Sequence, residues 1–252
     1  MDTLYFAPPV FLIIAFVFSM LGMGGSQLYI PLLFWLGMDF KTQAIPLGIL
    51  LNVASSMSAT VTYARTRLID WRIAIAFGAS VVVFAPLGAW INTGLRPKLI
   101  ILVFALFTAA AAALMLSGWK PERPALSARR RVLLGVAAGT VLGFFAGLLG
   151  RGGGAFVVPL LYIMGLDPKS AAATSSLIVT FSGSSSLCSH LLMAAKADWL
   201  MWTLCLLSVV VGSQIGSRFM ARKAKPRSVK LVFGLVLLGV AMLLIVKDVL
   251  MK

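Results

Sequence analysis

The sequence contains two copies of one pattern, and each copy opens on a cluster of glycines. Residues 22–52 align without a gap on residues 150–180, and the same offset of 128 positions continues beyond them. The matched pairs include Gly22 with Gly150, Gly24 with Gly152, Gly25 with Gly153, Pro31 with Pro159, Gly37 with Gly165, Asp39 with Asp167, and Asp70 with Asp198. We therefore expect two related repeats, residues 1–119 and residues 132–252, joined by a cytoplasmic linker over residues 120–131.

The composition predicts an all-α polytopic membrane protein. Hydrophobic residues make up 60% of the chain and charged residues only 12%, whereas a soluble domain carries roughly a quarter charged residues. The apolar runs are long enough to span a bilayer as helices. The net charge of +15 arises from basic residues between these runs, which favours a role in membrane orientation over nucleic-acid binding.

Ten apolar segments can be counted, and two of them are short. They cover approximately residues 5–21, 26–36, 42–63, 71–92, 99–116, 132–149, 155–164, 170–195, 199–219 and 229–246. An eleven-residue helix spans only ~16 Å of a ~30 Å hydrocarbon core. The second and seventh segments are this short, and each follows a glycine cluster that weakens a helix. Each repeat therefore contains either a broken crossing or a re-entrant hairpin.

The distribution of basic residues favours a broken crossing. With five crossings per repeat, fifteen lysines and arginines lie on the cytoplasmic side and six on the other, as the positive-inside rule requires. The cytoplasmic loops are then 65–72, 118–131 and 218–230. Because five is odd, the second repeat is inverted relative to the first. The expected fold is two inverted repeats of five membrane segments, each with a short helix broken at glycines, an architecture typical of secondary transporters.

The charged residues within the membrane segments favour an anionic substrate. All seven acidic residues lie at segment ends or in loops, whereas cation transporters usually place a carboxylate inside the membrane. Arg151 is the one basic residue inside a glycine cluster. Two interpretations of Arg151 remain open: it contacts an anion directly, or it snorkels to the outer interface.

Polar residues follow each glycine cluster at helical spacing. Asn52 and Ser55 lie in the third segment, and Thr180 occupies the position of Asn52 in the second repeat. Such residues either allow close helix packing or line a substrate cavity. The candidate substrate-binding residues are Gly24, Gly25, Ser26, Asn52, Ser55, Arg151, Gly152, Gly153, Gly154, Thr174, Ser175 and Thr180. The single histidine, His190, is either a proton carrier or an inert group near the outer interface. No cofactor or metal site is expected.

The doubled glycine motif resembles the TauE/SafE sulfite exporter family of membrane permeases. The residues that carry the resemblance are Gly22, Gly24, Gly25, Pro31 and Gly37, then Gly150, Gly152, Gly153, Gly154, Pro159, Gly165 and Ala172. The resemblance implies a multi-pass transporter of the bacterial inner membrane for small sulfur-containing anions such as sulfite, sulfoacetate or other organosulfonates. The chain departs from the family pattern in two places: Ser26 replaces a third glycine, and Arg151 replaces an apolar residue.

The leading hypothesis is secondary export of a small sulfur-containing anion. We expect the two glycine clusters to meet at one membrane depth and to present unpaired N–H groups of the short helices to the anion. An anion channel, or a permease for another small anion, is the alternative. An embedded enzyme or an assembly factor is a third hypothesis, which the single histidine and the lack of membrane carboxylates disfavour. The expected partners are the substrate anion and the lipid bilayer, without nucleic acid, and a homodimer is left open.

Overall fold

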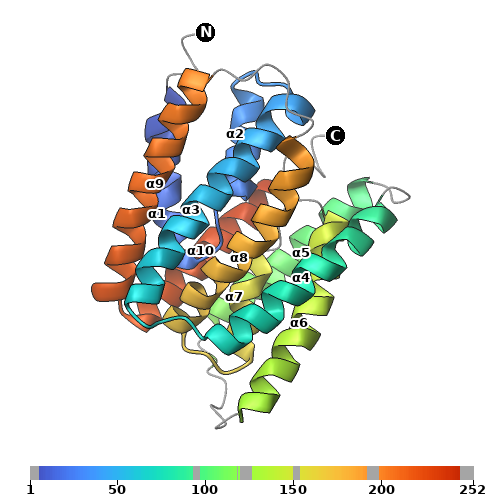
Figure 1. Ribbon diagram of the computed structural model, residues 1–252, viewed down its shortest axis with the longest axis vertical. Helices are drawn as coiled ribbons and strands as arrows, with labels where there is room; N and C mark the ends of the chain where they lie inside the picture. Colours follow the sequence, from blue (N-terminus) through green and yellow to red (C-terminus); the bar gives the residue numbers. More distant parts are fainter. Residues whose placement is uncertain are drawn as a thin grey trace.

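The computed structural model describes residues 6–92, 97–117, 119, 127–149, 154–191 and 199–244. Within these ranges the chain forms ten α-helices and no strand (Figure 1). The helices are α1 (Ala7–Leu21), α2 (Ser26–Trp35), α3 (Ile45–Arg65), α4 (Trp71–Asn92), α5 (Pro97–Leu116), α6 (Ala128–Leu149), α7 (Gly154–Ile163), α8 (Pro168–Leu191), α9 (Trp199–Arg222) and α10 (Pro226–Leu244). A single π-helical turn, η2 (Phe40–Ala44), leads into α3.

Each of the ten apolar segments corresponds to one helix, and the two short segments form helices of ten residues each. The predicted linker differs at its end, because α6 already begins at Ala128. Ser127 caps this start, since its hydroxyl accepts from the backbone N–H of Arg130 at 3.4 Å. Arginine also has a high helix propensity, so the basic run joins the helix.

The helix directions can be followed in Figure 1. Helices α1, α3, α5 and α9 run from the upper end of the molecule towards the lower end, while α4, α6, α8 and α10 run upwards. Both short helices begin near the middle, and α2 runs to the upper end while α7 runs to the lower end. The broken segments of the two halves therefore point in opposite directions.

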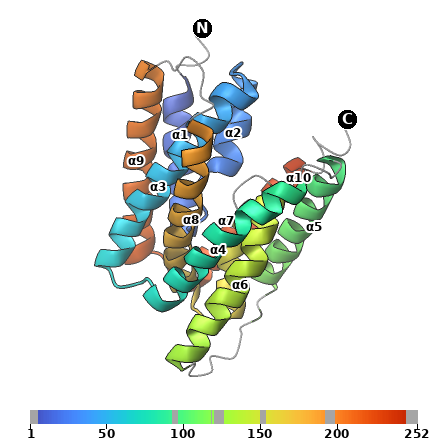
Figure 2. The same ribbon diagram turned by 45° about the vertical axis from the view of Figure 1, so that its right-hand side comes forward.

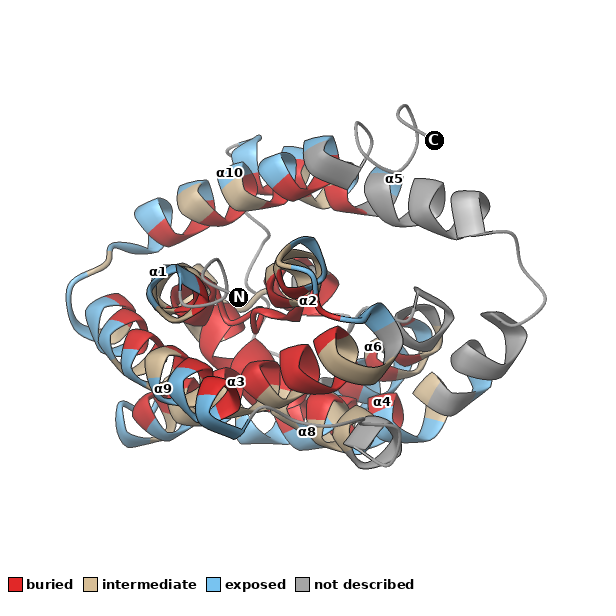
Figure 3. Cartoon of the chain, turned by 90° about the horizontal axis from the view of Figure 1, so that it is seen from above, coloured by how far each residue is buried: buried red, intermediate tan, exposed pale blue. Residues whose placement is uncertain are grey.

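Helices α3 and α8 pack against each other. Helix α9 packs on α3 and α4 packs on α8, while α1 lies along α9 and α6 along α4. Figure 2 separates the group of α1, α3 and α9 from the group of α4, α5 and α6. Helices α5 and α10 pack together along one side, as the view from above shows (Figure 3).

Glycines bring two of these helix pairs into close contact. Gly212 and Gly216 of α9 lie against the backbone carbonyls of Leu12 and Phe16 in α1. Gly139 of α6 lies in the same way against the carbonyl of Phe77 in α4. Small residues spaced four apart allow helix backbones to approach closely in membrane proteins. The spacing of these glycines therefore determines which helices can pair.

The exposed side of α9 carries large apolar residues, and part of its buried side carries small polar ones. Leu200, Leu207 and Ile215 are each more than half exposed, while Ser213 and Ser217 are fully buried. Figure 3 shows exposed residues along the outside of this helix. By length and composition, Thr42–Arg65 and Trp199–Arg222 could each cross a membrane. Large apolar side chains on the exposed face of a helix suit a bundle surrounded by lipid.

Candidate functional site

The first glycine cluster ends α1 and reverses the chain near the middle of the molecule. Gly22 has a φ of 69° and Gly24 a φ of 67°, a conformation that glycine adopts without steric cost. The N–H of Gly22 donates to the carbonyls of Phe18 and Ser19, and that of Met23 to Phe18 at 3.2 Å. These bonds satisfy carbonyls at the end of α1, so the break leaves its helix end capped.

Asn52 of α3 closes the N-terminus of α2. Its side-chain oxygen accepts from the backbone N–H of Gly25 at 2.7 Å and from that of Ser26 at 3.1 Å. The expectation that these two N–H groups are unpaired is therefore wrong. An amide oxygen from a neighbouring helix replaces the usual N-cap side chain, because Gly25 at that position has none.

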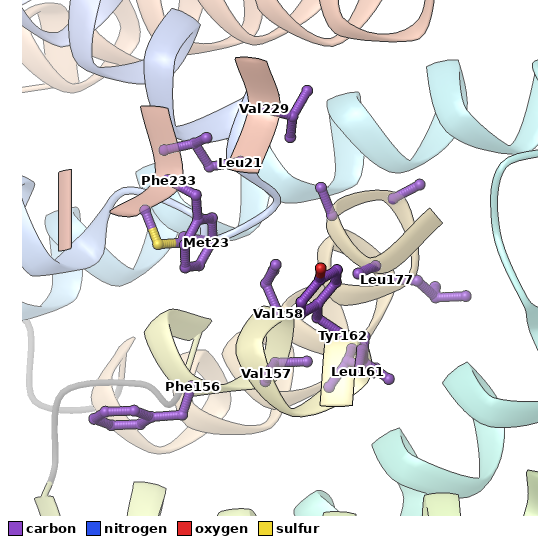
Figure 4. Packing of buried hydrophobic residues seen from close by; sticks show 14 of the residues in the cluster. Leu21, Met23, Phe156, Val157, Val158, Leu161, Tyr162, Leu177, Val229 and Phe233 are labelled. Carbon is purple, nitrogen blue, oxygen red and sulfur yellow. The ribbon is translucent and has the colours of Figure 1, made fainter. Parts of the chain in front are cut away.

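The first glycine cluster contacts Gly154, the last glycine of the second cluster. Gly154, the first residue of α7, lies against the backbone carbonyl of Met23, and a side chain there would collide with it. Gly24 is enclosed by the Asn52 side chain and by Val179 of α8. Figure 4 shows Met23 in the same buried cluster as Val157 and Val158 of α7. Arg151, Gly152 and Gly153 lie outside the described residues, so their predicted roles rest on the sequence.

The candidate hydroxyls of α8 hold neighbouring backbone groups. The Ser175 hydroxyl donates to the carbonyl of Gly22 at 2.7 Å, and Thr174 accepts from the N–H of Asp70 at 3.0 Å. Thr180 donates to the carbonyl of Ser176 at 2.8 Å and lies 3.1 Å from the Ser56 hydroxyl. These side chains stabilise the α1 end, the α4 start and the α3–α8 contact, which matches the packing interpretation.

A second polar network joins α3 to α9. The Ser213 hydroxyl donates to the backbone carbonyl of Ser55 at 2.6 Å. The Gln214 amide nitrogen donates to the carbonyl and the hydroxyl of Ser58, each at 2.8 Å, and its oxygen accepts from Thr62 at 3.2 Å. Each of these polar atoms has a partner, so the network fixes the two helices in register.

Two polar residues of α2, Gln27 and Tyr29, are not among the candidate residues predicted from the sequence. The amide of Gln27 and the hydroxyl of Tyr29 are buried, and neither has a hydrogen-bond partner. The same is true of the Ser55 hydroxyl, which belongs to the predicted set. The available signal was the presence of polar side chains in a short apolar helix directly after a glycine cluster. Gln27 and Tyr29 therefore join the candidate site.

The described carboxylates act as helix caps. Asp39 accepts from the N–H of Thr42 at 2.8 Å, and Asp167 from that of Lys169 at 3.1 Å. Asp70 accepts from the N–H of Ile73 at 3.3 Å. Each carboxylate lies at the start of a helical segment, where negative charge is favourable. None of these three lies in the middle of a helix.

His190 belongs to α8, and its side chain is not among the described ones, so its proton-carrier role stays a prediction. Among the described residues, no group of three or more histidine, cysteine, aspartate or glutamate side chains gathers that could hold a metal ion.

Comparison with known proteins identifies the relationship of this chain. The profile of the family described as Sulfite exporter TauE/SafE matches residues 8–244, which spans all ten helices apart from the first residue of α1. The chain belongs to the TauE/SafE sulfite exporter family. It is accordingly a membrane protein of the transporter type, and the resemblance carried by the doubled glycine motif is confirmed.

Relatives of this TauE/SafE chain are described as transporters. The probable membrane transporter protein YunE of Bacillus subtilis is 25% identical, over 94% of this chain and 96% of its own length. A probable membrane transporter protein of Xylella fastidiosa is 28% identical, over 92% of this chain and 91% of its own. A sulfite exporter TauE/SafE family protein of Arabidopsis thaliana is 30% identical over 43% of this chain and 25% of its own.

Proposed function

We propose that this protein is a secondary exporter of small sulfur-containing anions, with sulfite as the first candidate and sulfoacetate and other organosulfonates as further ones. The observation that carries the proposal is the meeting of two broken helices at Met23 and Gly154. Broken helices at mid-membrane form the substrate sites of many transporters, because their termini and exposed backbone bind ions. The family description supports sulfite as the substrate class.

The alternating-access mechanism rests on two inverted five-helix repeats. Helices α1 to α5 correspond to α6 to α10 by the offset of the sequence. If each helix is replaced by its counterpart in the other repeat, the contact between α1 and α9 becomes one between α6 and α4. In the same way, α3–α9 becomes α8–α4 and α2–α3 becomes α7–α8. The structure contains both members of each of these three pairs of contacts. The contacts α3–α8 and α5–α10 map onto themselves. This pairing, with the opposed directions of α2 and α7, supports a two-fold relation in the membrane plane.

The proposed location is the bacterial inner membrane, with the lower end of Figure 1 in the cytoplasm. Arg67, Arg129, Lys169 and Lys225 all lie in or beside the turns at that end. Cytoplasmic loops carry the excess of lysine and arginine. Substrate would then enter from the basic side, where an anion is attracted electrostatically.

The test is sulfite flux into proteoliposomes that contain the purified full-length protein, with empty liposomes as the control. The proposal expects flux that saturates with sulfite concentration and that an imposed ion gradient drives against the sulfite gradient. Flux that never saturates and always follows the gradient would identify an anion channel. Flux of other small anions without flux of sulfite would identify a permease of another specificity.

A further inference from the structure

The buried polar atoms without partners are concentrated at the broken helix. In the described part of the chain they are the amide nitrogen and oxygen of Gln27, the hydroxyl of Tyr29 and the hydroxyl of Ser55. Such atoms are rare in folded proteins because each has lost its hydrogen bonds to water. Three residues of this kind, two in the ten-residue helix α2 and one in its neighbour α3, indicate a group that binds there.

The Tyr29 hydroxyl lies at the N-terminus of α2. Tyr29 follows Gly25 by one helical turn, and its ring folds back so that a side chain on Gly25 would overlap the hydroxyl end of the ring. Phe11 of α1 contacts the ring edge-to-face, with centroids 5.2 Å apart. This contact and complete burial hold the hydroxyl in place beside the glycine cluster.

The Ser55 hydroxyl has no hydrogen-bond partner. It lies on the side of α3 that carries Asn52, whose amide contacts Gly25 beside the Tyr29 hydroxyl. Ser55 is fully buried and follows Asn52 by nearly one turn of α3. Gln27 is two residues from Tyr29, and since two residues turn a helix by about 200°, its amide faces another side. The hydroxyl pair is therefore Tyr29 with Ser55.

We propose that Tyr29 and Ser55 together bind one oxygen atom of the transported oxyanion, a proposal that rests on the function proposed above. Asn52 already occupies the N–H groups of Gly25 and Ser26, so the two hydroxyls are further donors at this end of α2. Both hydroxyls can donate. The positive end of the helix dipole lies beside them and favours a negative ligand over a cation.

Sulfite binding to the purified full-length protein at neutral pH, measured by isothermal calorimetry, tests the pair. Tyr29→Phe and Ser55→Ala each remove one hydroxyl and little else. Each variant is expected to weaken sulfite binding about tenfold to a hundredfold, the loss of one hydrogen bond to a charged group. The thermal midpoint of the ligand-free variants should not fall, because the hydroxyl removed had no partner in the protein.

Tyr63→Phe is the matched control. The Tyr63 hydroxyl is also buried but donates to the carbonyl of Ser19 at 2.7 Å, so this variant should lose thermal stability and keep the sulfite affinity of the wild type. If Tyr29→Phe and Ser55→Ala instead behave like the control, the pair serves packing or a structural water, and the inference is overturned while the proposed function stands. A wild-type protein that neither binds nor transports sulfite would overturn both.

Discussion

At the scale of the residue, Asn52 determines which backbone N–H groups of the first broken helix remain available to a ligand. Its amide oxygen satisfies two N–H groups from a distance of 26 and 27 residues along the chain. Its counterpart Thr180 is committed instead to Ser176 and Ser56. The two halves therefore differ at equivalent positions, although their helices correspond.

Asn52→Ala is expected to destabilise the protein, because two buried N–H groups lose their acceptor, at a cost of about 1–3 kcal/mol for each group left unpaired. Asn52→Asp keeps an acceptor and adds a negative charge beside the proposed anion site. We expect Asn52→Asp to retain more of the thermal stability than Asn52→Ala but to lose sulfite flux. Equal sulfite flux in Asn52→Asp and the wild type would show that the anion does not bind beside Asn52.

Arg151 is tested by substitution, because its place rests on the sequence. Arg151→Ala should weaken anion binding about tenfold or more if the guanidinium contacts the substrate, while expression stays near that of the wild type. Arg151→Lys keeps the charge, and its anion affinity in calorimetry should lie between those of Arg151→Ala and the wild type. Unchanged affinity in both variants would identify Arg151 as an anchor at the membrane interface.

At the scale of the element, glycines determine how the outer helices pack on the inner ones. Gly216 of α9 faces the carbonyl of Phe16 with no space for a side chain, whereas Gly239 of α10 faces open space. The two glycines are both in helix interiors, so helix propensity alone would favour alanine equally at both positions.

Gly216→Ala is expected to lower the thermal midpoint in detergent, because overpacking against a backbone carbonyl costs about 1–3 kcal/mol. Gly239→Ala is the matched control and should raise stability by up to about 1 kcal/mol, the propensity difference between the two residues. A stabilised Gly216→Ala variant would show that α1 and α9 do not pack this closely.

At the scale of the whole molecule, the basic residues and the helix directions predict one orientation. The turns after α3 and after α9 lie at the same end in Figure 1, and the turn after α2 lies at the other. Because Arg67 and Lys225 occupy the first two turns, the positive-inside rule assigns that end to the cytoplasm.

Single cysteines introduced into a variant without Cys188 and Cys205 test this orientation in intact cells. Arg67→Cys and Lys225→Cys should resist a membrane-impermeant thiol reagent until the cells are opened. Phe40→Cys, at the exposed turn after α2, should react at once. Labelling of Lys225→Cys in intact cells would contradict the inverted arrangement, since that turn would then lie outside.

The sequence alone determined the helices, their number, the two breaks and the family, because these follow from local properties: apolar length, glycine spacing and the internal repeat. Only the tertiary structure decided which polar groups remain available. Asn52 reaches Gly25 and Ser175 reaches Gly22 across 27 and 153 residues, and no periodicity encodes such pairings. Tyr29 and Ser55 became visible as a pair because burial and hydrogen bonding depend on neighbours that folding brings together.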